Sequence, residues 1–137
     1  MRDIDVVDST WICTPPGTLA ALVAEPGNWR RWWPALELTV DEWRGNKGVR
    51  WTVGPSERGS VVGSMEVWLE PRLDGVVAHF FLRLGRADGR PLGRRRVRTL
   101  TDRYRTSAKE LFWALGNQLD PGRVARVSER RQVACSE

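Results

Sequence analysis

The spacing of the hydrophobic residues changes once along this chain, and that change constrains the fold more than any other feature. Between residues 36 and 84, apolar residues recur at every second position in four consecutive segments, as in half-buried β-strands. From Val97 to Leu119 they recur at every third or fourth position, as in an amphipathic helix about 35 Å long. The pattern therefore predicts an antiparallel meander followed by one long helix.

One set of alternating residues in each predicted strand is apolar and is expected to face inward. These residues are Leu36, Leu38 and Val40; Val49, Trp51 and Val53; Val61, Met65, Val67 and Leu69; and Val76, Ala78, Phe80, Leu82 and Leu84. The apolar stripe of the helix consists of Val97, Leu100, Tyr104, Ala108, Leu111, Leu115 and Leu119. Because so long a stripe must be buried, we expect the helix to lie on the concave face of the sheet, with a hollow between them.

Three shorter elements are predicted before the meander. Residues 3–13 are rich in β-branched residues and lead into two prolines, which indicates a strand and its end. A short helix is expected over residues 16–24, because proline is favoured in a first helical turn. A second helical turn with three tryptophans lies between Pro26 and Pro34. The 137 residues suit a single domain, which we place at residues 1–120, followed by a charged tail over residues 121–137.

Composition argues against several classes of protein. No apolar run approaches the ~20 residues of a membrane span. The first eight residues include three aspartates and no apolar stretch typical of a signal peptide, so we expect a cytoplasmic protein. Two cysteines and one histidine are too few for a disulfide framework or a zinc site. Nucleotide-binding and nucleophile motifs are also missing, and we therefore expect neither metal nor cofactor.

The charge of the chain is uneven. Residues 1–82 carry a net charge of −3 and residues 83–137 a net charge of +8, and 20 of the 22 basic residues are arginine. Six arginines are expected to project away from the apolar stripe of the long helix: Arg94, Arg95, Arg96, Arg98, Arg103 and Arg105. Arginine suits phosphate recognition, but no signature of a nucleic-acid module accompanies these residues. We interpret them as a solvated helix face, with weak binding of nucleic acid or an anionic surface as a third hypothesis.

The order of elements resembles the helix-grip fold of the START-like (SRPBCC) superfamily. The residues that carry the resemblance are 29–34 (WRRWWP), 44–51 (RGNKGVRW), 63–71 (GSMEVWLEP) and 74–83 (DGVVAHFFLR), and the specific match is to small actinobacterial polyketide cyclase/dehydrase-like proteins. The resemblance covers residues 3–120. It implies an α+β fold in which a curved antiparallel sheet of five to seven strands wraps around the C-terminal helix. The family usually has six strands in the meander, whereas four are predicted here, so the cavity is expected to be smaller or more open.

This fold assigns a set of residues to the expected cavity. The candidate ligand-binding residues are Trp32, Trp33, Trp51, Met65, Phe80, Tyr104, Ala108 and Leu111. One interpretation is a pocket in which Tyr104 orients a hydrophobic ligand. The other is a filled core in which the Tyr104 hydroxyl bonds a backbone carbonyl. Trp32 and Trp33, between their prolines, either gate the mouth of the cavity or plug the end of the sheet.

Two functions follow from the resemblance. The first is binding of a hydrophobic small molecule, such as a lipid or a polyketide-like compound, without chemistry. The second is a cyclase or dehydrase, in which holding a reactive chain in the right geometry contributes roughly 7–11 kcal/mol. Tyr104 is the best catalytic candidate. The predicted inward face offers no His, Asp or Glu as a proton acceptor, and this weakens the enzyme hypothesis.

The outer face of the predicted sheet carries a separate set of residues. If residue numbers across the last hairpin sum to 145, Glu66 lies opposite His79, which we interpret as a surface pair rather than a general base. Trp68, Val77 and Phe81 on the same face indicate an interface, and a homodimer through it remains open.

Overall fold

A computed structural model describes residues 3–55 and 61–120, and the predicted tail at 121–137 lies outside the described residues. The elements in chain order are β1 (Ile4–Ile12), α1 (Pro16–Val23), α2 (Pro26–Trp32), β2 (Glu37–Trp43), the 3-10 helix η1 (Gly45–Lys47), β3 (Gly48–Gly54), β4 (Val61–Arg72), β5 (Gly75–Arg86) and α3 (Arg94–Leu119). The predicted order is confirmed, and α3 begins three residues before the apolar stripe that predicted it.

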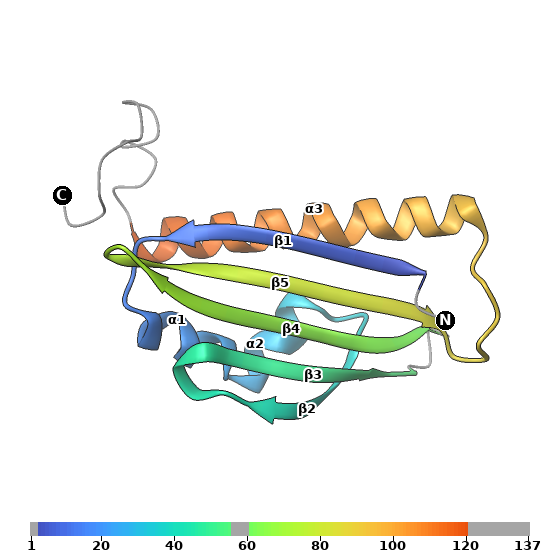
Figure 1. The fold of residues 1–137 in the computed structure, drawn as a ribbon, viewed down its shortest axis with the longest axis horizontal. Coiled ribbons are helices and arrows are strands. Elements are labelled where there is room, and N and C mark those ends of the chain that lie inside the picture. The colour runs from blue at the N-terminus through green and yellow to red at the C-terminus, as the bar shows by residue number, and fades with distance from the viewer. Residues whose placement is uncertain (1–2, 56–60, 121–137) are drawn as a thin grey trace.

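The five strands form one curved antiparallel sheet in the order β1-β5-β4-β3-β2 (Figure 1). Strands β2 to β5 are the predicted meander, and β1 joins the far side of β5. All three helices lie against the same face of the sheet (Figure 1). Helix α3 runs along β1, and α1 and α2 lie over the part of this face formed by β3 and β4. This is the α+β helix-grip architecture, and the predicted fold class is confirmed.

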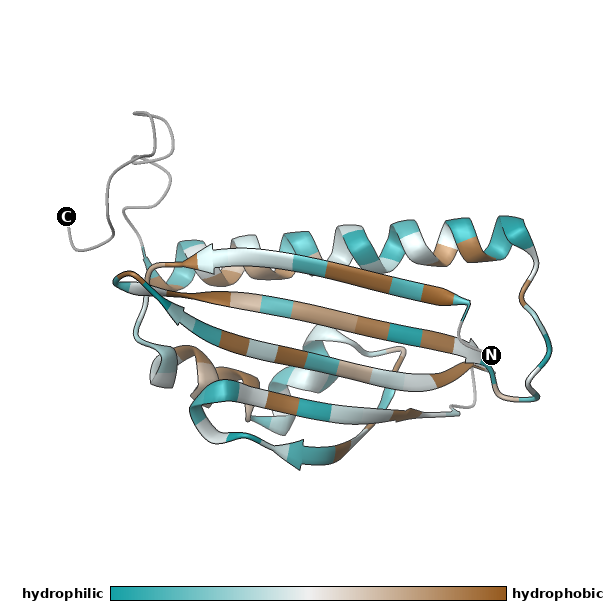
Figure 2. Ribbon diagram, viewed as in Figure 1, coloured by the Kyte–Doolittle hydropathy of each residue, from teal (hydrophilic) through white to brown (hydrophobic). Residues whose placement is uncertain are grey.

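The strands alternate between a buried inner face and a more exposed outer face, visible as bands of hydropathy along each strand in Figure 2. The predicted inward residues of β3, β4 and β5 are buried, apart from Val61, which is half-buried. On β2 the inward residues Leu38 and Val40 are only half-buried, because this strand is at the edge of the sheet. The inner faces of all five strands, together with residues of the helices, form one hydrophobic cluster.

The hairpin between β4 and β5 corrects the predicted register. Arg72 pairs with Gly75, so Leu73 and Asp74 are the two turn residues, and residue numbers across the hairpin sum to 147 rather than 145. Leu73 takes a left-handed backbone conformation, with a φ of 57°. Such a φ is rare for leucine, so the sequence did not point to a turn centred there. The slip of two residues leaves every side chain on its predicted face.

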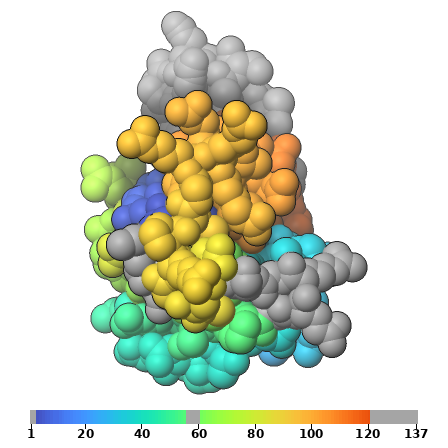
Figure 3. All heavy atoms as spheres, turned by 90° about the vertical axis from the view of Figure 1, so that its right-hand side faces the viewer, coloured from blue at the N-terminus to red at the C-terminus, as the bar shows by residue number. Residues whose placement is uncertain are grey.

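Only the second half of α3 is deeply packed. Its buried residues are Ala108, Phe112, Leu115 and Gly116. The earlier stripe residues Val97, Leu100 and Tyr104 are half-buried, while the arginines among them are exposed. Figure 3 looks onto the end of the molecule where α3 begins, and these first turns protrude toward the viewer. Across residues 3–55 and 61–120, no helix is both long enough and apolar enough to span a membrane.

Candidate ligand-binding site

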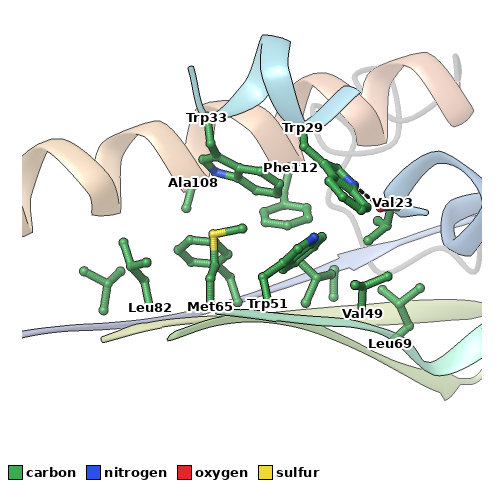
Figure 4. Packing of buried hydrophobic residues seen from close by; sticks show 14 of the residues in the cluster. Val23, Trp29, Trp33, Val49, Trp51, Met65, Leu69, Leu82, Ala108 and Phe112 are labelled. Atoms are coloured by element: carbon green, nitrogen blue, oxygen red, sulfur yellow. Dashed lines mark hydrogen bonds between the residues drawn. The ribbon is translucent and has the colours of Figure 1, made fainter. Parts of the chain in front are cut away.

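The short helix α2 directs two tryptophans onto the sheet. Pro26 occupies the first turn, and the Glu25 side chain accepts a hydrogen bond of 3.2 Å from the Gly27 backbone N–H, which fixes the start of the helix. Trp29 and Trp33 are four residues apart, so they share one face of the helix. Figure 4 shows both rings projecting from α2 toward Trp51 and Met65 of the sheet.

The two tryptophans complete an aromatic cluster between the sheet and the helices. The Trp33 ring stacks on Phe80 with centroids 6.1 Å apart, and it meets Trp51 edge-on at 5.6 Å. Trp29 meets Trp51 edge-on at 5.2 Å, and its indole N–H donates to the backbone carbonyl of Val23. The Phe112 ring of α3 also contacts Phe80, with ring centroids 6.3 Å apart. Trp33 and Phe112 therefore occupy part of the space in which the sequence predicted a hollow.

A pocket of about 450 Å³ opens beside α2. It lies between α2 and the start of β2, and its lining residues are Pro26, Trp29, Arg30, Trp33, Pro34, Leu36, Glu37 and Leu38. The volume falls within the ≈300–1,000 Å³ of small-molecule pockets. Trp33 lines this pocket and its ring also stacks on Phe80, so this residue belongs to both the pocket and the aromatic cluster.

The structure brings most of the predicted binding residues together. The Trp33 ring contacts the rings of both Trp51 and Phe80. Met65 and Ala108 are buried in the same cluster, Met65 on the strand next to Trp51 and Ala108 on α3. Trp32, Tyr104 and Leu111 are half-buried at its border, and the Trp32 ring packs edge-on against Trp33 at 5.6 Å. Ligand binding by these residues stays a prediction.

Two members of the cluster, Trp29 and Phe112, are not among the predicted binding residues. Each could have been found from helical spacing, because Trp29 precedes Trp33 by four residues and Phe112 follows Ala108 by four residues. The chosen stripe passed through Leu111 instead, which is only half-buried.

The expectation that the inner face has no carboxylate is wrong. Asp8 alternates with the buried residues Val6 and Thr10 on β1, so its side chain points under α3 and is only 10% exposed. Its Oδ1 atom lies 2.9 Å from the Nζ atom of Lys109 on α3. The alternation of β1 was a sufficient signal for this placement.

Three buried polar atoms on the inner face have no hydrogen-bond partner among the described residues. They are Oδ2 of Asp8, Oγ1 of Thr10 and Nε1 of Trp51. Buried polar atoms in proteins nearly always have a partner, so unpaired atoms that share one face mark a place where water or another molecule can complete the bonding.

Tyr104, the predicted catalytic candidate, is half-buried beside this region. Burial raises the pKa of its hydroxyl, and the nearby Arg103 opposes that shift. A raised pKa keeps the phenol protonated at neutral pH, which suits it to donate a hydrogen bond or a proton and not to act as a base.

The outer face holds a different arrangement from the predicted Glu66–His79 pair. His79 lies opposite Trp68, with the two rings stacked at 4.7 Å. Its Nδ1 atom is 2.8 Å from the Ser9 hydroxyl and its Nε2 atom is 3.0 Å from a carboxylate oxygen of Glu70. Glu66 accepts a hydrogen bond from Arg44 instead. The surface location is as predicted, but the partners differ because of the shifted register.

The six arginines of α3 are exposed, as predicted. Arg105 lies 3.9 Å from Asp102, a distance that gives little stabilisation at an exposed site. Among residues 3–55 and 61–120, no three His, Cys, Asp or Glu side chains come together in a way that could hold a metal ion.

Comparison with known proteins yields structural neighbours only. No protein-family model matches the chain, and no curated protein matches it. The Aha1 dimer from Colwellia psychrerythraea superposes with a TM-score of 0.61 at 12% identity, covering 85% of this chain and 96% of that one. Protein MLL2253 from Mesorhizobium loti gives 0.60 at 18% identity, covering 81% and 96%. DR_A0006 from Deinococcus radiodurans gives 0.50 at 15% identity, covering 76% and 95%. At these identities the likeness shows a shared fold.

Proposed function

We propose that this protein binds a flat, hydrophobic small molecule on the inner face of its sheet, entering beside α2. The observation that carries the proposal is the position of Trp33, a residue that lines the open pocket and whose ring covers Phe80. A ligand ring that displaced Trp33 would stack on Phe80 and meet the edge of Trp51. The exchange would replace one set of aromatic contacts with another, so it would cost little packing energy.

The local backbone supports movement of Trp33. It is the C-terminal cap of α2, with a φ of −133° and a ψ of 64°, and Pro34 follows it directly. Its backbone N–H donates to the Trp29 carbonyl at 2.8 Å, and a turn of the ring about the side-chain bonds leaves this hydrogen bond in place. Trp29 is held by its bond to Val23 and would remain as a fixed wall. In this proposal Trp33 is the gate that the sequence analysis considered.

Calorimetric titration with 2-methoxynaphthalene tests the proposal. We expect saturable binding at one site in the wild-type protein and tighter binding, by at least fivefold, in Trp33→Ala, because the ligand no longer has to displace the indole ring. Trp113→Phe is the matched control, since Trp113 is on α3 and is 42% exposed, and it should bind like the wild type. Absence of saturable binding in both the wild type and Trp33→Ala would refute the proposal.

A second candidate is a cyclase or dehydrase that acts on an aromatic or poly-carbonyl substrate, as the resemblance implies. The protonated Tyr104 hydroxyl supports it, since a neutral phenol can polarise a substrate carbonyl. Tyr104→Phe with unchanged ligand affinity and abolished turnover would support catalysis. Lack of turnover by the wild type on a panel of linear poly-carbonyl thioesters would argue against it.

We also propose that the outer face forms a homodimer contact. Val7 is 58% exposed there, and the predicted interface residues Trp68, Val77 and Phe81 lie on the same face. The similar Aha1 structure is described as a dimer. Phe81→Glu should convert a dimer to a monomer in light scattering, and a monomeric wild type would refute this contact.

A further inference from the structure

The inner face of β1 carries an incomplete hydrogen-bonding site beneath α3. Asp8 and Thr10 are two residues apart on the same face of the strand, and Thr10 is only 8% exposed. Oδ2 of Asp8 and Oγ1 of Thr10 are both buried without a partner in the described part of the chain. One hydroxyl group that donates to the carboxylate oxygen and accepts from the threonine hydroxyl can satisfy both.

The position of Asp8 links this site to the aromatic cluster. Asp8 pairs with Phe80 across β1 and β5, and directly paired residues of neighbouring antiparallel strands have Cβ atoms about 4.5–5.5 Å apart. Phe80 is the ring on which Trp33 stacks. Asp8 and a ring that took the place of Trp33 would therefore border the same Phe80 side chain.

The carboxylate is already held in place on its other side. Lys109 contacts Oδ1, so the two oxygens of Asp8 have separate roles: one is tied to α3 and the other is free toward the core. A carboxylate oxygen fixed in this way is an acceptor ready for a donor, with no further ordering needed on binding.

We propose that Asp8 and Thr10 recognise a hydrogen-bond donor on the edge of the bound molecule, so that the ligand is an aromatic or polycyclic compound that carries a hydroxyl group. This inference rests on the proposed ligand binding over Phe80 and names the chemical class of the ligand. The hydroxyl donates to Oδ2 of Asp8 and accepts from the Thr10 hydroxyl. An ether at the same position has no proton to donate and leaves the carboxylate oxygen unpaired.

The test compares 2-naphthol with 2-methoxynaphthalene by calorimetric titration at pH 7. In the wild-type protein we expect 2-naphthol to bind at least tenfold more tightly, because a hydrogen bond to a charged acceptor discriminates strongly against a ligand that lacks the donor. In Asp8→Asn the preference should fall below threefold, with the affinity for 2-methoxynaphthalene unchanged within twofold. Asp8→Asn is expected to fold, since Lys109 is half exposed and water can replace its partner.

Asp5→Asn is the matched control. It removes the same charge from the same strand, but Asp5 faces outward, 3.8 Å from Arg83. It should keep the full preference for 2-naphthol. Thr10→Val removes the second unpaired atom with little change in shape and should lower the preference about threefold, and this variant decides the matter if Asp8→Asn does not fold.

The outcomes distinguish a failure of the donor site from a failure of the proposed ligand binding. Equal affinity of the wild type for both compounds overturns the donor site and leaves the proposed ligand binding standing. An unchanged preference in both Asp8→Asn and Thr10→Val also overturns it. Failure of both compounds to bind overturns the proposed function itself.

Discussion

Each face of the sheet places a polar residue of β1 beside an aromatic ring of β5, but the two faces differ in how these polar groups are hydrogen-bonded. One row across the inner face reads Asp8, Phe80, Val67, and the adjacent row across the outer face reads Ser9, His79, Trp68. On the outer face the Ser9 hydroxyl and both ring nitrogens of His79 are hydrogen-bonded. On the inner face the Asp8 carboxylate has one bonded oxygen and one unpaired oxygen. This difference is the reason for proposing the binding site on the covered face.

The largest expected effect comes from comparing two neighbouring phenylalanines. Phe80 is buried between Trp33 and Phe112, whereas Phe81 is half-buried on the outer face. Phe80→Ala should cost about 3–5 kcal/mol of unfolding free energy, and Phe81→Ala about 1 kcal/mol. Urea denaturation monitored by circular dichroism measures both. Equal costs would mean that the outer face is buried in an assembly or that the inner cluster is loosely packed.

The second comparison is between two substitutions that each remove a hydroxyl group and should change the free energy of unfolding in opposite directions. Thr10→Val removes a buried hydroxyl that has no partner, so it should stabilise the free protein by about 1 kcal/mol. Ser9→Ala removes a hydroxyl that is bonded to His79, so it should destabilise by about 0.5–1 kcal/mol. Opposite signs in thermal unfolding sharpen the contrast between the two faces. A loss of stability in Thr10→Val would mean that its hydroxyl is satisfied by bound water.

The smallest expected effect is a pH dependence of the protein's stability that comes from Tyr104, at the border of the aromatic cluster. Burial raises the pKa of Tyr104 in the folded protein, so the folded state holds this proton more tightly than the unfolded chain does. Stability should therefore be constant below the ordinary tyrosine pKa of about 10 and should fall as the pH rises through the folded value. Tyr104→Phe should flatten that fall in urea denaturation between pH 9 and 11. An equal slope in the variant would show that other groups cause it.

Much of the fold could be predicted because the signals are local. A period of two fixes which residues of a strand share a face, and this holds even when a register slips by two, as it does at Leu73. The aromatic packing that fills the centre of the candidate site could not be predicted from such local signals. Whether Trp33 closes over Phe80 depends on how α2 docks on the sheet, which is a tertiary arrangement with no periodic signal. Asp8 was predictable from its alternation with Val6 and Thr10, but a single carboxylate among apolar residues is easily passed over.

The most direct test of the account uses the eight tryptophans of the chain as reporters of the two faces. In a two-dimensional ¹H–¹⁵N spectrum each indole N–H gives one signal. During titration with 2-naphthol, we predict saturable shifts for the inner-face signals of Trp33 and Trp51, while those of Trp11 and Trp68 on the outer face stay in place. Shifts confined to Trp11 and Trp68, or no shifts at all, would contradict binding on the inner face.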